Sequence, residues 1–94
     1  MDYIKTHFIK NTFFFKSNPS NFEKESKNIK NNTLRVMSFE ELTEVEEVWK
    51  SNTDLKICIE NTHSHEVFIR ELKDVSALAL PGTWWGVIFT WKIK

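Results

Sequence analysis

The densest group of potential metal ligands lies between residues 58 and 66, where Cys58, Glu60, His63, His65 and Glu66 follow one another closely. Thiolate and imidazole groups are ligands that zinc and other transition metals prefer. The spacing C-x-E-x-x-H-x-H, however, matches no tetrahedral zinc pattern, and the two histidines fall among turn residues. We therefore interpret the segment as the polar end of a hairpin with a small buried cysteine, and predict neither a metal ion nor a cofactor.

Acid–base cleavage of RNA is a second chemistry to consider, because small ribonucleases need only a histidine pair, or a histidine with a carboxylate and a cation. The chain supplies His7, His63, His65, Arg35 and Arg70 for such a site. An enzyme that acts on a polyanion is normally basic, whereas thirteen basic and thirteen acidic residues cancel here. No Gly-rich phosphate loop, nucleophile elbow or HExxH motif is present, so the sequence favours a protein that is not an enzyme.

The aromatic segment 84–91 is a candidate for binding rather than catalysis. Its tryptophans favour a central strand packed in the core, although aromatic faces can also stack on bases or sugars. Trp84 and Trp85 cannot both face the same side of a regular strand, so we expect one of them at the surface. An exposed tryptophan is typical of a protein-binding hot spot. We take Trp84 as the candidate partner-binding residue, while the pattern leaves open which of the two is exposed.

Acidic residues gather in one segment of the chain. Residues 1–37 carry seven basic and three acidic side chains, residues 38–54 one basic and six acidic, and residues 55–94 five basic and four acidic. Within the middle segment, Glu40, Glu44 and Glu47 share one face of a predicted helix, and Asp54 follows nearby. Such a face is commonly just solvated surface. The alternative is a negative ridge that docks into a basic cleft of another protein, and these four acids complete our candidate partner-binding set with Trp84.

The helix that carries this ridge has the strongest local signal in the chain. Ser38 and Glu41 form a capping-box pattern that predicts a helix over about 38–50. Apolar residues recur along one face of it, namely Phe39, Leu42, Val45 and Trp49. A second, short helix is predicted over about 19–29, because Pro19 suits a first helical position.

The remaining elements are predicted as strands. Aromatic and β-branched residues favour two short strands, or one long bent strand, over 3–15, with a helix as the less favoured alternative and Asn11-Thr12 as a turn. Alternation and turn residues predict further strands at 33–37, 55–60, 67–72, 77–80 and 84–93. The predicted fold is therefore a single α+β domain over 1–94, with a mostly antiparallel sheet of five or six strands packed against the 38–50 helix.

Composition places the chain among ordinary globular proteins, with 40% apolar and 28% charged residues. Cys58 is the only cysteine, which excludes an internal disulfide. No run of 18 apolar residues occurs, and the first residues lack the basic start and apolar stretch of a signal peptide. We expect a cytoplasmic protein.

The chain is also rich in residues with A/T-rich codons: 35 of its 94 residues are Lys, Asn, Ile or Phe (11, 8, 8 and 8). With its small size, neutral charge, acidic helix start Ser38-Phe39-Glu40-Glu41-Leu42 and aromatic strand Trp84-Trp85-Gly86-Val87-Ile88-Phe89, it resembles the small immunity proteins of bacterial toxin systems. Those systems include contact-dependent growth inhibition. Immunity proteins differ in fold, so the resemblance transfers no binding residue.

The resemblance implies an immunity protein or antitoxin that binds a toxic enzyme, a nuclease above all, and blocks its active site. The expected partner is a toxin with a basic active-site cleft, with no direct nucleic-acid or membrane binding. The alternative is a phage- or island-encoded inhibitor of another host protein, and the third possibility is a small RNA-processing enzyme.

Overall fold

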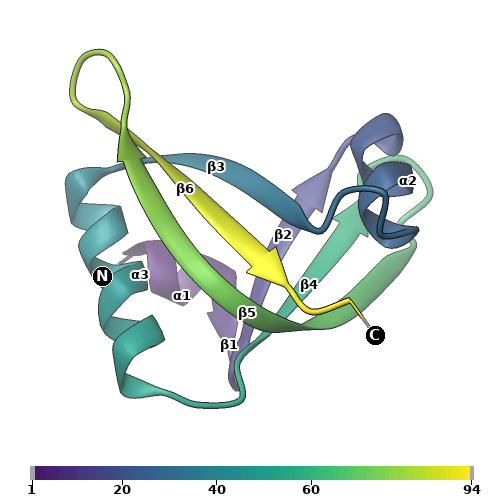
Figure 1. The fold of residues 1–94 in the computed structure, drawn as a ribbon, viewed down its shortest axis with the longest axis horizontal. Coiled ribbons are helices and arrows are strands. Elements are labelled where there is room, and N and C mark those ends of the chain that lie inside the picture. Colours follow the sequence, from purple (N-terminus) through teal and green to yellow (C-terminus); the bar gives the residue numbers. More distant parts are fainter. Residues whose placement is uncertain (1, 94) are drawn as a thin grey trace.

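In the part of the chain that the structure describes, six strands form one curled, mixed sheet that carries three helices (Figure 1). The computed structural model describes residues 2–93. In chain order the elements are α1 (Asp2–His7), β1 (Phe8–Ile9), β2 (Thr12–Ser17), α2 (Pro19–Ser26), β3 (Asn32–Ser38), α3 (Phe39–Ser51), β4 (Lys56–Asn61), β5 (Val67–Ala79) and β6 (Trp84–Trp91). The strand order is β1-β2-β4-β5-β6-β3. Only β2 and β4 pair in parallel, which confirms the predicted α+β domain with a mostly antiparallel sheet.

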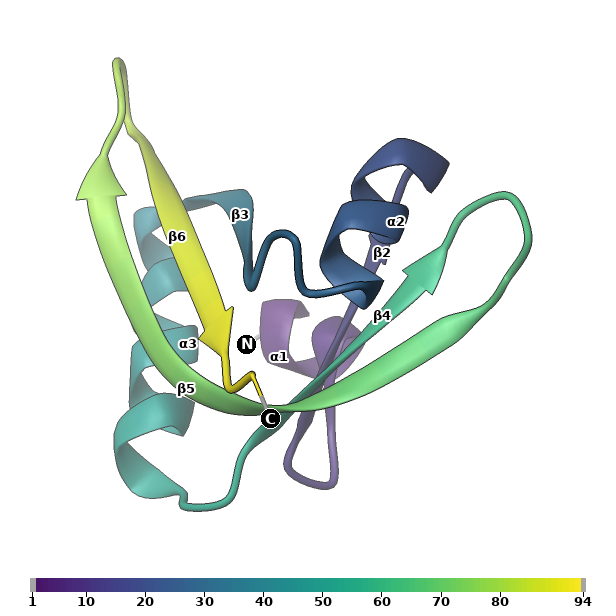
Figure 2. The same ribbon diagram turned by 45° about the vertical axis from the view of Figure 1, so that its right-hand side comes forward.

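One long strand, β5, gives the sheet its curl (Figure 2). Its first part pairs with β4 and its second part with β6, and the register shifts between Leu72 and Asp74. The sequence predicted two separate strands at 67–72 and 77–80, and this was wrong. A β-bulge bends a strand without interrupting its hydrogen bonding to its neighbours, so the single strand β5 can pair with β4 and then with β6. We call β1, β2, β4 and the start of β5 the first half-sheet, and the end of β5, β6 and β3 the second half-sheet.

The N-terminal segment begins as a helix, although strands were favoured there. In α1 the Ile4 amide donates to the Glu44 carboxylate of α3 at 3.2 Å, and Tyr3 is buried in the core. Tertiary packing on α3 therefore overrides the β preference of these residues. The strand prediction holds only from β1 onward, and the turn lies at Lys10 and Asn11, which both have positive φ (48° and 67°).

The predicted capping box at the start of α3 is confirmed. The Glu41 amide donates to Ser38 Oγ at 3.2 Å, and the Ser38 amide donates to Glu41 Oε1 at 2.8 Å. Leu42 and Val45 are buried against the sheet, but Phe39 is 61% exposed, contrary to the predicted apolar stripe. Phe39 occupies the first helical position, where its ring lies beside Trp85 with centroids 6.2 Å apart instead of entering the core.

The short helix α2 is confirmed but ends earlier than predicted. Asn18 caps it by accepting from the Asn21 amide, and it ends at Ser26. Asn28 then adopts a left-handed conformation (φ 59°), which ends the helical path. As a result Ile29, the last residue of the predicted 19–29 helix, lies outside α2 and is 74% exposed.

The alternation predicted for the last strand is confirmed as far as Trp91. Val87, Phe89 and Trp91 are fully buried, and Trp85 is partly buried beside them. The stripe stops where β6 ends, so Ile93 is 55% exposed. The rings of Phe13 and Phe15 meet Phe89 with centroids 5.2 and 4.8 Å apart, which joins the two half-sheets in one core.

Candidate functional site

Trp84 is the exposed member of the tryptophan pair, with 52% of its surface accessible. It lies on the outer face of the second half-sheet with Leu34, Val36 and Leu78, which are 45–57% exposed. We call these four residues the outer apolar face. Contiguous exposed apolar side chains on a sheet are a feature of interaction surfaces rather than of ordinary solvated surface.

Gly86 lies at the centre of this face. A Cβ atom there would come within 3.1 Å of Leu34 Cδ1, 3.5 Å of Leu80 Cδ1 and 3.6 Å of Leu78 Cγ. The missing side chain therefore lets Leu34 of β3, and Leu78 and Leu80 at the end of β5, approach the backbone of β6 closely. The outer apolar face is packed laterally and is not a loose set of side chains.

The four predicted acidic residues lie in different environments. Glu40 and Glu47 are exposed on α3, and Asp54 is exposed beyond its end in a left-handed conformation (φ 58°). Glu44 is only half-exposed, because its carboxylate accepts the Ile4 amide. Glu44 thus anchors α1 on α3 at the same time as it belongs to the acidic face.

The register of β3 and β6 connects the acidic helix to the outer apolar face. Ser38 pairs with Trp84, and α3 begins at the next residue. Phe39 and Glu40 are exposed at this helix start. The sequence thus proposed Trp84 and the acidic helix separately, and the structure brings the helix start next to the tryptophan.

The hairpin cluster forms no metal site within residues 2–93, where no three His, Cys, Asp or Glu side chains converge on one point. Glu60 accepts from His65 Nδ1 at 2.7 Å, and the His63 amide donates to Asn61 Oδ1 at 2.8 Å. Cys58 is buried, and burial, with the nearby Glu60 charge, raises the pKa of its thiol.

The histidines of this hairpin are expected to be dispensable for folding. His63→Ala changes the free energy of unfolding by less than about 0.5 kcal/mol, because the side chain is exposed. His65 has a positive φ of 64°, so His65→Asn is the appropriate variant there, since asparagine tolerates this conformation. Urea unfolding of both variants checks this, and stoichiometric zinc lost together with stability would contradict it.

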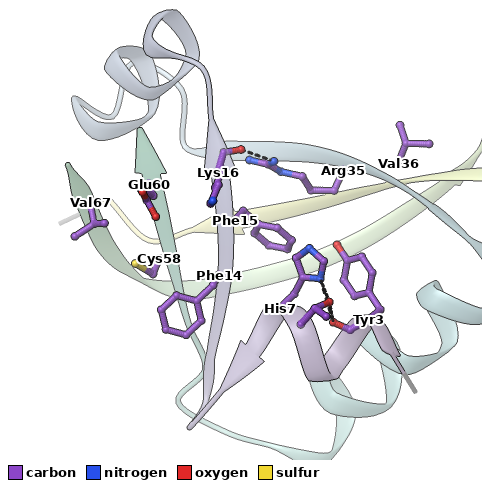
Figure 3. A pocket seen from close by; sticks show the side chains of 11 residues that line it. Tyr3, His7, Phe14, Phe15, Lys16, Arg35, Val36, Cys58, Glu60 and Val67 are labelled. Atoms are coloured by element: carbon purple, nitrogen blue, oxygen red, sulfur yellow. Dashed lines mark hydrogen bonds between the residues drawn. The ribbon is translucent and has the colours of Figure 1, made fainter. Parts of the chain in front are cut away.

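A second feature, which the sequence did not predict, is an open groove with a volume of about 580 Å³ (Figure 3). It passes over the edge of β2 beyond the short pairing with β1. On one face of β2 it is bounded by α1 and β3, and on the other face by β4 and the start of β5. The residues that line it come from five elements and are Tyr3, Thr6, His7, Phe14, Phe15, Lys16, Arg35, Val36, Cys58, Glu60 and Val67.

Arg35 closes one side of the groove by joining β3 to β2. Its Nη1 donates to the Lys16 carbonyl at 2.7 Å and its Nη2 to Ser17 Oγ at 3.0 Å, and its guanidinium lies 4.8 Å from the centre of the Phe15 ring. Ser17 in turn donates to the buried Glu25 carboxylate at 2.8 Å. Burial lowers the pKa of Arg35, and the nearby Glu25 carboxylate partly opposes this shift.

Removing this link is expected to destabilise the fold. Arg35→Met lowers the free energy of unfolding by about 2–3 kcal/mol, because it removes charge-assisted hydrogen bonds across the sheet edge and a cation near buried Glu25. Lys16→Met is the matched control, since Lys16 contributes only its backbone carbonyl. Urea denaturation measures both, and equal stability of the two variants would contradict a linking role for Arg35.

His7 and Tyr3 form the opposite wall of the groove. Their rings stack with centroids 4.2 Å apart, and His7 Nδ1 lies 3.1 Å from the Tyr3 carbonyl and 2.8 Å from Thr6 Oγ1. His7 Nε2 forms no hydrogen bond with residues 2–93, and neither does the Tyr3 hydroxyl. Burial raises the pKa of Tyr3 far above its ordinary value, with smaller opposing effects of Arg35 and Glu41, so the hydroxyl stays protonated.

The structure therefore brings together two of the five residues considered for acid–base cleavage, His7 and Arg35. His63 and His65 lie on the hairpin turn. Arg70 lies over the Phe68 ring and donates to the Ser26 carbonyl at 3.0 Å, away from the groove.

Comparison with known proteins gives this chain no relative: no family model, no curated protein and no solved structure matches it significantly. Between residues 2 and 93, none of the helices has the length and apolar character that crossing a membrane requires.

Proposed function

We propose that this chain is an inhibitory binding protein of the immunity or antitoxin type, which binds a toxic enzyme, a nuclease above all, and blocks its active site. The observation that carries the proposal is the junction of the outer apolar face with the acidic start of α3, set by the pairing of Ser38 with Trp84.

The apolar part of this junction has the composition of an interface centre. Trp84 and its neighbours leave about half of their surface in water, and water removal from such groups is the main favourable contribution to association. The residues of the outer apolar face belong to β3, β5 and β6, whose backbones are hydrogen-bonded to one another. Their backbone is therefore already ordered, and little conformational entropy is lost when a partner binds.

The acidic part supplies the charge expected to match a cleft built for nucleic acid. Glu40 and Glu47 project from α3, and Asp54 extends the negative charge beyond the helix end. A polyanion-binding enzyme carries basic residues in its cleft, and complementary charge raises the association rate and fixes orientation. Apolar burial at Trp84, with Glu40 near it at the start of α3 and further acids along the helix, therefore supports a mechanism that is both steric and electrostatic.

The test is site-specific photo-crosslinking followed by an activity assay. A photoreactive amino acid at position 84 is expected to capture one protein in the source cell, whereas the same group at exposed Lys56, on the other half-sheet, captures none. The captured protein is then purified and its enzymatic activity titrated with the chain. Complete inhibition at one equivalent supports the proposal.

Three results contradict it. Capture of an enzyme whose activity the chain leaves unchanged removes the inhibitory role. Capture and inhibition of a host protein that is not a toxin favours the alternative, an inhibitor of phage or island origin. Cleavage of RNA by the purified chain, abolished by His7→Ala, replaces the binding role with a ribonuclease that uses the groove.

A further inference from the structure

Strand β3 forms one border of the sheet, and its free edge carries backbone groups without partners (Figure 1). The Trp91 amide donates to the Asn31 carbonyl at 3.0 Å, which fixes the alternation of hydrogen bonds between β3 and β6. Odd-numbered residues of β3 therefore bond to β6, and the N–H and C=O groups of Asn32, Leu34 and Val36 point away from it. Those of Leu34 and Val36 make no hydrogen bond with residues 2–93.

This edge lacks the features by which natural sheets prevent edge pairing, namely very short strands, proline, lysine and bulges. The seven residues of β3, Asn32–Ser38, include no proline or lysine, and their pairing with β6 shows no register shift. Arg35 does not protect the edge, because its guanidinium is bonded to β2. The side chains of Leu34 and Val36 are 49% and 57% exposed. A regular, exposed edge of this kind is a template for another extended strand.

We propose that the strand that pairs with this edge is β3 of a second copy of the chain, in an antiparallel two-fold dimer. A two-fold axis presents the same edge twice, so each outward donor of one copy meets an acceptor of the other. The pairing uses backbone groups in the plane of the sheet. Side chains of the outer apolar face project from that plane, so the dimer leaves Trp84 accessible and goes beyond the proposed function.

Charge complementarity favours a second copy as the partner. Lys30 lies two residues before β3 and is partly exposed, and Glu40 lies two residues after β3 and is exposed. Antiparallel pairing places the basic end of each β3 beside the acidic end of the other, and the two-fold axis forms this contact twice. The uneven charge of a chain with no net charge is thereby matched between the two copies.

The register of the pairing follows from the same edge. With Leu34 opposite Leu34 of the second copy, Val36 lies opposite Asn32, and all three outward-pointing residues form hydrogen-bonded pairs. An axis at Arg35 would place two guanidinium groups opposite each other, and like charges in that position destabilise a sheet. An axis at Val36 would require the Ser38 amide, which already donates to the carboxylate of the capping box. The pairing is therefore centred on Leu34.

Sedimentation of the purified chain over micromolar to millimolar concentrations tests the proposal. The mean mass is expected to rise from that of one chain toward that of two, with a dissociation constant on the order of 10–100 μM, because a one-strand interface is small. Val36→Pro removes an outward N–H and no bond to β6, and the two-fold axis doubles the loss, so the dimer weakens by at least roughly tenfold. Val36→Ile keeps the N–H and is the control, with affinity unchanged.

Leu34 provides a second test that needs no proline. Because Leu34 lies on the proposed axis, Leu34→Lys places two ammonium groups opposite each other, and Leu34→Glu places two carboxylates there. Each variant alone is expected to stay monomeric. An equimolar mixture of the two is expected to associate, since opposite charges then face each other across the axis. Leu34 is half-exposed, so neither variant disrupts the core.

Hydrogen exchange of backbone amides locates the interface. The amides of Leu34 and Val36 are expected to exchange rapidly in dilute protein and to slow at concentrations where the dimer forms. Those of Thr33 and Arg35 are bonded to β6 and serve as an internal control, because their protection does not depend on association. Thermal unfolding confirms that each variant is folded.

A mass of one chain at millimolar concentration overturns the proposal. A dimer that persists in folded Val36→Pro overturns the placement at β3, as do Leu34 and Val36 amides whose exchange does not change with concentration. A mixture of Leu34→Lys and Leu34→Glu that stays monomeric overturns the pairing at Leu34. All of these measurements use the purified chain alone, so their failure is separate from that of the photo-crosslinking at position 84.

Discussion

Phe89→Ala is expected to lower the free energy of unfolding by about 3–5 kcal/mol, a large part of the whole stability of a domain of this size. Phe89 is fully buried in β6, between β5 and β3, and its ring meets those of Phe13 and Phe15. The truncation therefore leaves a cavity where the two half-sheets join, and rigid strands on both sides prevent its collapse.

Phe39→Ala is the matched control for that variant. The same atoms are removed from a side chain that is 61% exposed, so the expected loss is below about 1 kcal/mol. Urea unfolding of both variants gives the comparison. A melting temperature of Phe89→Ala within a few degrees of the parent protein would contradict the central position of β6.

The elements that could be predicted from the sequence are those whose signals are local. The capping box of α3 depends on Ser38 and Glu41, three residues apart, and the structure contains both of its hydrogen bonds. The alternation from Trp85 to Trp91 is equally local, since a strand buried on one face needs an apolar residue at every second position. Both elements fold as their own sequence dictates.

The elements that were missed depend on distant parts of the chain. Helix α1 is stabilised by the Ile4 amide on Glu44 of α3, forty residues away, and six residues alone carry too weak a helical signal. The bulge that makes β5 continuous appears only in its pairing with β4 and β6. Phe39 fits the helical stripe by spacing, but its ring lies beside Trp85 and stays 61% exposed instead of entering the core.

The same distinction separates the two candidate sites. Alternation in β6 showed that one tryptophan of the pair is exposed, and the structure identifies it as Trp84. The groove left no comparable signal, because His7, Lys16, Arg35 and Glu60 come from four elements and share no motif. The pairing of β2 with β4 places Lys16 beside Glu60, and the packing of α1 and β3 places His7 and Arg35 against Phe15, and sequence periodicity reports neither.

Reversing the acidic residues of α3 is expected to weaken binding of the inhibited enzyme by about 2–4 kcal/mol. The variant is Glu40→Lys with Glu47→Lys, since both side chains are exposed and share one helix face. Glu44 is left intact, because its carboxylate accepts the Ile4 amide and its reversal would also release α1. Asp54 is not part of this variant. It has a positive φ of 58°, so its charge is removed separately by Asp54→Asn, because asparagine tolerates this conformation.

Two comparisons make this result specific to the proposed interface. Glu46→Lys introduces the same kind of charge reversal on α3 about 100° around the helix from Glu47, so it leaves affinity within about 0.5 kcal/mol. Trp84→Ala removes the apolar centre without changing charge and weakens binding by at least about 2 kcal/mol.

Salt separates the two contributions, because steering between exposed charges is screened over a Debye length of about 8 Å at physiological ionic strength. Raising the salt concentration slows association of the parent protein and of Trp84→Ala, but does not slow association of the double reversal, because its lysines repel a basic cleft and salt screens that repulsion. Inhibition curves at low and moderate salt measure both effects. If the folded double reversal inhibits as well as the parent protein, the acidic face lies outside the interface. Binding then depends on the outer apolar face alone, which the Trp84→Ala curve measures directly.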